Sequence, residues 1–269
     1  MTLIEALALK DREVISLVGG GGKTTLMFAL GHELAAHRKG IILTTTTKIR
    51  EPAVSSFGFF LAPQLSAMME WIGQNRERHP FLLVARERLA NGKLQGVPPQ
   101  WVEEIYSLEG VSVIVVEADG AAGRSLKAPR EDEPVVPKNA SLLVPVVGIN
   151  VLGCPLDEQY VFRSEIAARL LNLSIGSKVT EEVIATLLSE SIKSRPPKAR
   201  VIPFINKVDL PNGLEKARNL AQALLNMHEP KIARVLLGQA QHSPVVTEIC
   251  SSFPHPSLRL RRKRGRVRA

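Results

Sequence analysis

Several features that define other classes of protein are scarce in this chain of 269 residues. Its two cysteines, Cys154 and Cys250, cannot form a disulfide framework and indicate a reducing compartment. The six histidines lack the spacing of zinc ligands. No apolar run is long enough to cross a bilayer, and the N-terminal segment carries Glu5 and lacks the basic start of a secretion signal. We therefore expect a cytoplasmic protein without a transmembrane segment.

Net positive charge is also small outside one segment. The formal net charge is +9, but residues 259–268 hold seven positive charges and no negative one, which leaves +2 for the rest. The high pI therefore does not indicate a nucleic-acid-binding domain. The segment has no aromatic side chain for base stacking. We expect residues 1–250 to form one α/β domain and residues 251–269 a disordered basic tail, or alternatively an arm that contacts RNA, an acidic partner or anionic lipid.

A run of four glycines lies between a strand pattern and a helix pattern. Residues 14–18 are mostly apolar or β-branched and predict a buried strand, and the apolar spacing after Thr25 predicts a helix. A strand, a glycine loop and Lys-Thr at a helix start are typical of a phosphate-binding loop. Lys23 would bind the β- and γ-phosphates, and the Thr24 hydroxyl would bind Mg²⁺. The expected nucleotide-binding residues here are Gly19, Gly20, Gly21, Gly22, Lys23, Thr24 and Thr25.

The loop is shorter than the usual phosphate loop. That pattern has a glycine six residues before the lysine, and here the position holds Leu17. The segment thus resembles the compact Gly-x-x-Gly-Lys-Thr loop of Mur-type peptide ligases more than the loop of Ras-like GTPases. A small-molecule kinase or an ATP-dependent ligase therefore stays open. The structural alternative is a glycine turn followed by Lys-Thr by chance.

Threonines follow the next predicted strand, residues 41–43. Thr44 to Thr47 and Lys48 would lie at its carboxyl end, where ligands bind in open α/β sheets. One of these threonines is a candidate ligand for Mg²⁺, and we assign Thr45 to that role. The alternative is a β-branched strand that continues to the surface.

Two carboxylates end the uncharged strand predicted over residues 111–116. Glu117 and Asp119 are two residues apart, so on a strand they share a face and can meet one Mg²⁺ or position an attacking group. We assign both as catalytic residues with Lys23, and as metal ligands. Arg124 and Lys127, in the loop that follows, are candidate anion clamps. The alternatives are a polar strand end with an Asp-Gly turn and ordinary surface charges.

A later strand end carries the pattern that P-loop GTPases use for guanine. Asn206, Lys207 and Asp209 form Asn-Lys-x-Asp after an apolar segment. A carboxylate only accepts hydrogen bonds, and guanine offers two donors on one edge where adenine offers an acceptor. The alternative is a turn that starts a helix. Strands are also predicted over residues 81–85 and 141–147, and the last over 232–237. Their alternation with helices predicts a P-loop NTPase-like α/β fold, with a mainly parallel sheet and helices on both faces.

Taken in order, these motifs resemble those of the YqeC family, accessory proteins of selenium-dependent molybdenum hydroxylases. The resemblance implies a role in maturing such a hydroxylase or its cofactor, with a molybdenum hydroxylase or a cofactor-maturation protein as partner. It spans most of residues 1–250. The segments that carry it are Val18-Gly-Gly-Gly-Gly-Lys-Thr-Thr25, Thr44-Thr-Thr-Thr-Lys48, Val116-Glu-Ala-Asp-Gly120, Leu126-Lys-Ala-Pro129, Val147-Gly148 with Gly153 and Arg163, and Asn206-Lys-Val-Asp209.

The sequence therefore predicts a protein that binds Mg²⁺ with GTP or ATP. The leading hypothesis is a nucleoside triphosphatase that assists maturation of a molybdenum hydroxylase. The alternatives are a small-molecule kinase or ATP-dependent ligase, and a nucleotide-gated binding protein without turnover.

Overall fold

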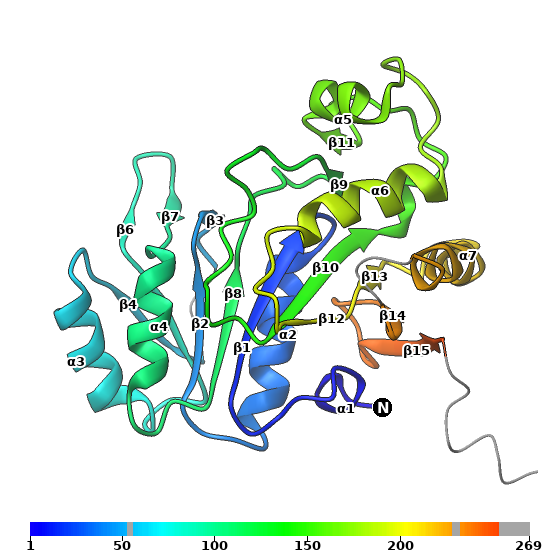
Figure 1. The fold of residues 1–269 in the computed structure, drawn as a ribbon. Helices are drawn as coiled ribbons and strands as arrows, with labels where there is room; N and C mark the ends of the chain where they lie inside the picture. The colour runs from blue at the N-terminus through cyan, green and yellow to red at the C-terminus, as the bar shows by residue number, and fades with distance from the viewer. Residues whose placement is uncertain (53–55, 228–231, 253–269) are drawn as a thin grey trace, which may run out of the picture.

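The computed structural model describes residues 1–52, 56–227 and 232–252, so the predicted basic tail beyond Ser252 lies outside the described residues. Its centre is a large sheet in the order β15-β14-β13-β10-β1-β8-β2-β5-β4, with β12 paired to β10 (Figure 1). Every pairing in it is parallel except that of β14 with β15. The strands are β1 (Glu13–Gly19), β2 (Ile41–Thr45), β4 (Gly58–Leu61), β5 (Leu82–Ala85), β8 (Val113–Glu117), β10 (Leu142–Gly148), β12 (Arg200–Val201), β13 (Phe204–Asn206), β14 (Arg234–Gly238) and β15 (Val246–Ser251).

Helices cover both faces of this sheet. Alternate residues of β1 enter two separate cores: Ile15 and Leu17 lie in one, and Val14 and Val18 in the other. The first core holds the apolar sides of α1 (Leu3–Ala6) and α2 (Lys23–Ala35). The second holds those of α3 (Leu65–Asn75), α4 (Pro99–Ser107), α5 (Ser164–Leu171), α6 (Glu181–Ile192) and α7 (Gly213–Leu225). The predicted fold class is confirmed.

The sequence-based prediction that the strand ending near Leu237 is the last one is wrong. β15 follows it and pairs antiparallel with β14 at the edge of the sheet. Only Val246 in β15 is fully buried, because an edge strand leaves part of its surface to solvent. An edge strand of this kind lacks the continuous apolar run that marks the buried parallel strands.

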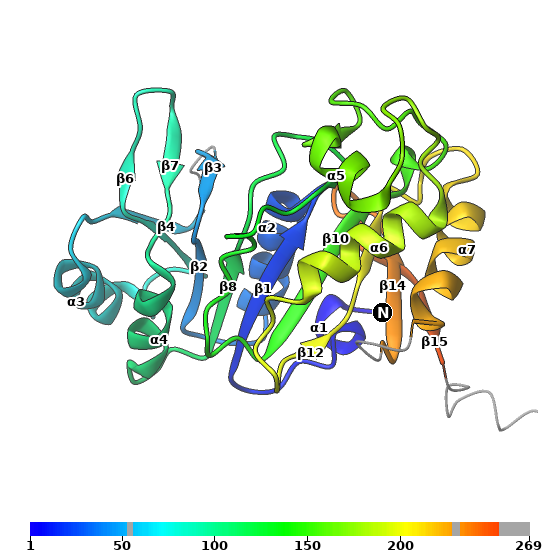
Figure 2. The same ribbon diagram turned by 45° about the horizontal axis from the view of Figure 1, so that its top comes forward.

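Two small sheets rise beyond the carboxyl edge of the large one (Figures 1 and 2). One is antiparallel and contains β3 (Lys48–Arg50), β7 (Lys93–Gln95) and β6 (Glu87–Arg88). The other pairs β9 (Leu126–Lys127) with β11 (Val161–Phe162), just before α5. Between β10 and β11 lies a short 3₁₀ helix, η1 (Ile149–Val151). Among the described residues, no helix combines the length and the apolar character needed to span a membrane.

Candidate functional site

The sheet order brings the predicted site residues to one edge. β1 lies between β8 and β10, and β8 is also paired to β2. The register places Glu117 beside Leu17 of β1 and beside Thr45 of β2. Because these strands are parallel, the glycine loop, the carboxylates and the threonines all follow carboxyl ends of adjacent strands.

The backbone of the loop adopts angles that favour glycine at three positions. Gly19, Gly21 and Gly22 have φ angles of +93°, +78° and +127°, a region that disfavours residues with a Cβ. The loop is also tightly enclosed, since a Cβ on Gly21 would lie 2.3 Å from the backbone nitrogen of Gly148. The four-glycine run therefore meets a steric need of this fold.

Three of the four glycine N–H groups donate to acceptors within the protein. Gly19 donates to Asp119 Oδ2 at 2.9 Å, Gly20 to the carbonyl of Val146 at 2.8 Å, and Gly21 to the carbonyl of Arg124 at 2.9 Å. The N-terminus of α2 has Gly22 as its cap and no side-chain cap. Within the described residues, the donors left for a phosphate are therefore the N–H of Gly22 and those of the first turn of α2, which begins at Lys23.

Lys23 is buried among acceptors at the bottom of the loop. Its ammonium donates to the carbonyl of Gly19 at 2.6 Å and lies 3.1 Å from Asp119 Oδ1 and 3.8 Å from Glu117 Oε1. Burial acts to lower the pKa of Lys23, but attraction to Asp119 and Glu117 outweighs it and raises the pKa. Lys23 is thus a charged group held between the two predicted carboxylates.

Thr24 and Glu117 offer two oxygen ligands that already meet. The Thr24 hydroxyl donates to Glu117 Oε2 at 2.6 Å. Burial raises the pKa of Glu117 above its usual value, and Lys23 and Thr24 offset this only in part. A hydroxyl and a carboxylate fit the oxygen preference of Mg²⁺. The Thr45 hydroxyl donates instead to the backbone carbonyl of Glu117 at 2.8 Å. This bond links β2 to β8.

Lys127 is a buried member of the site, in contrast to Arg124, which is half-buried. Its ammonium lies 3.2 Å from Asp119 Oδ2 and also pairs with Glu133. Arg163, at the start of α5, holds Glu133 with bonds of 2.6 and 2.8 Å. Charges of alternating sign therefore run from Lys23 through Asp119, Lys127 and Glu133 to Arg163. Arg124 donates to backbone carbonyls of Ala122 and Glu158 at the surface.

The pairing of Glu133 predicts a contribution to acid stability. Burial would raise the pKa of Glu133, but Arg163 and Lys127 outweigh it and lower the pKa from 4.5 to about 2. A carboxyl whose folded pKa is depressed stabilises the fold above its unfolded pKa and loses this effect as pH falls toward the folded value. We expect Glu133→Gln to make the free energy of unfolding less dependent on pH between about 4.5 and 2.

Urea unfolding at a series of pH values would measure how steeply the free energy of unfolding changes with pH. Glu87→Gln, at an exposed residue of β6, is the control and should keep the wild-type slope. Equal slopes for Glu133→Gln and the wild type would reject the assignment.

The Asn-Lys-x-Asp segment lies beside the glycine loop. The Asn206 amide donates to the carbonyl of Gly21 at 2.7 Å, and its oxygen accepts from the N–H of Ala240 at 2.8 Å. Lys207 has φ +66°, an uncommon angle for a side-chain-bearing residue, and its ammonium donates to Ser125 Oγ at 2.8 Å. Asn206 therefore ties the loop after β13 to the glycine loop and to the loop after β14.

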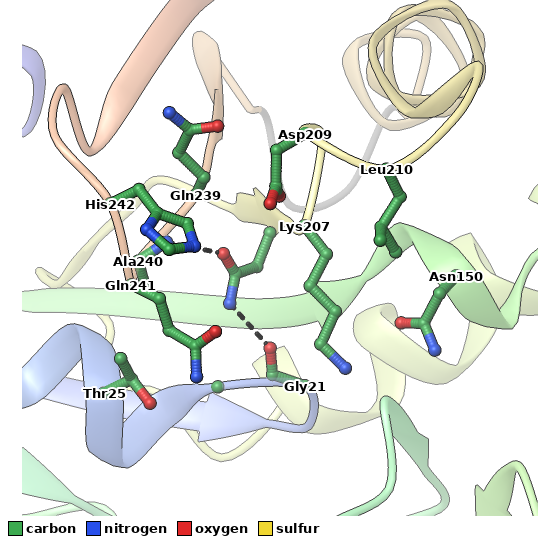
Figure 3. Close-up of a pocket in the computed structure, with 12 residues that line it drawn as sticks. Gly21, Thr25, Asn150, Lys207, Asp209, Leu210, Gln239, Ala240, Gln241 and His242 are labelled. Atoms are coloured by element: carbon green, nitrogen blue, oxygen red, sulfur yellow. Dashed lines mark hydrogen bonds between the residues drawn. The ribbon is translucent and has the colours of Figure 1, made fainter.

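A cavity of about 320 Å³ opens between these loops. Figure 3 shows Lys207 and Leu210 on one side, Gln241 and His242 on the other, and Gly21 at the base. Its lining residues are Gly21, Gly22, Thr25, Asn150, Asn206, Lys207, Asp209, Leu210, Gln239, Ala240, Gln241 and His242. The structure thus brings the predicted phosphate and base segments to one cavity.

Asn150, Leu210 and residues 239–242 of this lining were not predicted from the sequence. Residues 239–242 follow the carboxyl end of β14, which is adjacent to β13. Asn150 follows the carboxyl end of β10 within η1, and it accepts a bond from Ser125 Oγ at 2.8 Å. The rule that ligands bind at carboxyl strand ends would have singled out both segments.

Comparison with known proteins gives one family. The model of the family described as "YqeC protein" matches residues 15–165, more than half of the chain. The chain belongs to the YqeC family. A relative from Escherichia coli (strain K12), named "Uncharacterized protein YqeC", is 27% identical over 259 residues, which cover 91% of this chain and 94% of the relative.

The segment that matches the YqeC family model contains the residues around the glycine loop. It includes Lys23, Glu117, Asp119 and Lys127, and reaches Arg163 at the start of α5. The cavity residues within 206–210 and 239–242 lie after it. In this YqeC-family protein the loop, both carboxylates and the buried Lys127 therefore form one connected polar cluster.

Proposed function

We propose that this YqeC-family protein binds a nucleoside triphosphate with Mg²⁺ and hydrolyses it. The observation that supports this best is the cavity of about 320 Å³ that Gly21 and Gly22 share with Asn206, Lys207 and Asp209. It offers space for a base next to a glycine loop and a helix N-terminus, which are the parts that bind phosphate.

Each site residue has a role in this proposal. Lys23 binds the β- and γ-phosphates, and the first-turn N–H groups of α2 bind further phosphate oxygens. Thr24 and Glu117, whose oxygens lie 2.6 Å apart, would hold Mg²⁺, which neutralises charge on the transferred phosphoryl group. The sequence-based assignment of Thr45 and Asp119 as further metal ligands is not part of this proposal, because the Thr45 hydroxyl donates to the backbone carbonyl of Glu117 and Asp119 is paired with Lys23 and Lys127. Glu117 is the candidate to orient the attacking water.

The biological role that we propose is maturation of a selenium-dependent molybdenum hydroxylase or its cofactor. It rests on membership of the YqeC family and on the role in hydroxylase maturation that the resemblance to this family implies. A hydroxylase or a cofactor-maturation protein is then the expected partner, and an acidic surface of a partner is the proposed contact of the basic tail.

The decisive experiment is a competition titration of GTP against ATP with Mg²⁺, followed by measurement of phosphate release. Binding with release that a hydroxylase partner stimulates supports the proposal. Phosphate that appears on an added metabolite would favour the kinase or ligase alternative, which rests on the compact loop. Binding without release would favour a nucleotide-gated binding protein. Absence of binding to either triphosphate would reject all three.

Asp209 is proposed to distinguish guanine from other bases. Its carboxylate lines the cavity and would accept from the two donors on one edge of guanine. We expect Asp209→Asn to weaken GTP binding by about 10- to 100-fold, because a hydrogen bond to a charged group is lost. The amide can donate to the carbonyl of xanthine, so binding of XTP should improve.

Titrations of the wild type and of Asp209→Asn with GTP and with XTP measure this change in base preference. Asp11→Asn, at an exposed residue before β1, is the control and should leave both affinities unchanged. A wild-type protein that prefers ATP would refute the assignment of the base.

A further inference from the structure

Two buried lysines share the carboxylate of Asp119. Lys23 lies 3.1 Å from Oδ1, and Lys127 lies 3.2 Å from Oδ2. The N–H of Gly19 also donates to Oδ2, at 2.9 Å. The side chain of Asp119 is 0% exposed, as is that of Lys127. The carboxylate therefore has no access to solvent and depends on these two cations and one N–H for its stabilisation.

Binding of a triphosphate requires Lys23 to change partner. In the proposed function its ammonium contacts the β- and γ-phosphates, whereas here it contacts Gly19 O, Asp119 and Glu117. Within the described residues, Oδ1 of Asp119 accepts no hydrogen bond, so its contact with Lys23 is an ion pair without a fixed hydrogen-bond geometry. Once Lys23 moves away, however, a buried carboxylate without a cation is costly.

We propose that Lys127 is a positioning residue that keeps Asp119 neutralised while Lys23 moves to the triphosphate. The proposal rests on the proposed function, because it presupposes nucleotide binding. With Lys127 in place, one cation and one N–H still contact Asp119 after Lys23 has moved. Without it, Lys23 becomes the only cation beside Asp119 and is retained there, away from the nucleotide.

The surroundings of Lys127 fix it in this place. It lies in β9, which pairs with β11, and its ammonium is shared between Asp119 and Glu133. Glu133 is held in turn by two bonds from Arg163. Removal of the Lys127 charge therefore leaves Glu133 paired with Arg163, and leaves Asp119 with Lys23 as its remaining cation.

The test compares Lys127→Met with the wild type in equilibrium binding of GTPγS and ATPγS with Mg²⁺. Methionine keeps the length of the side chain and removes its charge. For the triphosphate that the wild type binds more tightly, we expect the Kd to rise about 10- to 100-fold, as expected when a buried charge loses its compensation. Lys93→Met, at an exposed lysine of β7, is the matched control and should stay within about threefold of the wild type.

A second substitution separates this role from direct contact with the nucleotide. Asp119→Asn removes the charge that retains Lys23, so the double variant Asp119→Asn/Lys127→Met should bind within about threefold of Asp119→Asn alone, since the two sites are coupled. This comparison also holds if Lys127→Met folds poorly, which thermal unfolding by circular dichroism would show.

The possible binding results distinguish failure of the inference about Lys127 from failure of the proposed function. A Lys127→Met protein that binds as the wild type does would overturn the inference and leave the proposed function intact. A double variant much weaker than Asp119→Asn would also overturn it, because Lys127 would then contact the nucleotide itself. A wild-type protein that binds neither triphosphate would instead refute the proposed function.

Discussion

Replacement of Lys23 by alanine is expected to weaken binding of a Mg²⁺-triphosphate by about 100- to 10,000-fold. The reason is that charge-assisted hydrogen bonds to two phosphates are lost, each worth about 1.5–3 kcal/mol. The fold should tolerate the change better than the site does, because Asp119 keeps its contacts with Lys127 and the N–H of Gly19. Calorimetric or fluorescence titration with GTP and ATP measures the effect.

Lys93→Ala is the matched control for this prediction. Lys93 is exposed in β7 of the small antiparallel sheet. It should change affinity by no more than about threefold, as expected for a solvated charge. Unchanged nucleotide affinity in Lys23→Ala would reject the assignment of residues 19–25 as a phosphate loop.

The second large effect is expected at Gly21, where alanine would destabilise the fold. Its φ angle of +78° disfavours a Cβ, and that Cβ would lie 2.3 Å from the nitrogen and 2.8 Å from the Cα of Gly148. Both contacts are to backbone, which can move only if β10 and the loop shift. We expect a loss of about 2–5 kcal/mol in the free energy of unfolding, from backbone strain together with overpacking.

Gly92→Ala separates these two causes. Gly92 has φ +73°, close to that of Gly21, but a Cβ there meets nothing within 4 Å. It should lose only the strain component, about 1–2 kcal/mol. Urea unfolding of both variants measures the difference. Equal losses would show that the enclosure of Gly21 by Gly148 carries no energetic cost.

Much of the fold was predictable because its signals are local. A buried parallel strand reads as a short apolar run, as over residues 14–18, and a glycine loop before a helix is visible in the order of residues alone. The carboxylates Glu117 and Asp119 were found for the same reason, since they directly follow such a run. Residues 206–209 were found because the Asn-Lys-x-Asp pattern directly follows an apolar segment.

The arrangement of these segments was not predictable in the same way. The register that sets Glu117 beside Thr45, and the pairing of β1 with both β8 and β10, depend on contacts between residues far apart in sequence. The edge strand β15 was missed because a half-solvated antiparallel strand has a weak apolar pattern. Residues 239–242 were missed because their role depends on β14 lying next to β13.

The sequence by itself determined that this protein has a glycine loop between a strand and a helix, polar residues at three further strand ends, and an α/β fold of the YqeC family. Only the tertiary structure decided which groups those residues contact. It assigned three glycine N–H groups to protein acceptors and placed Lys127, a candidate anion clamp in the sequence, in a buried pair with Asp119. Spacing along the chain fixes which residues share a face, whereas burial and charge pairing arise from segments brought together by folding.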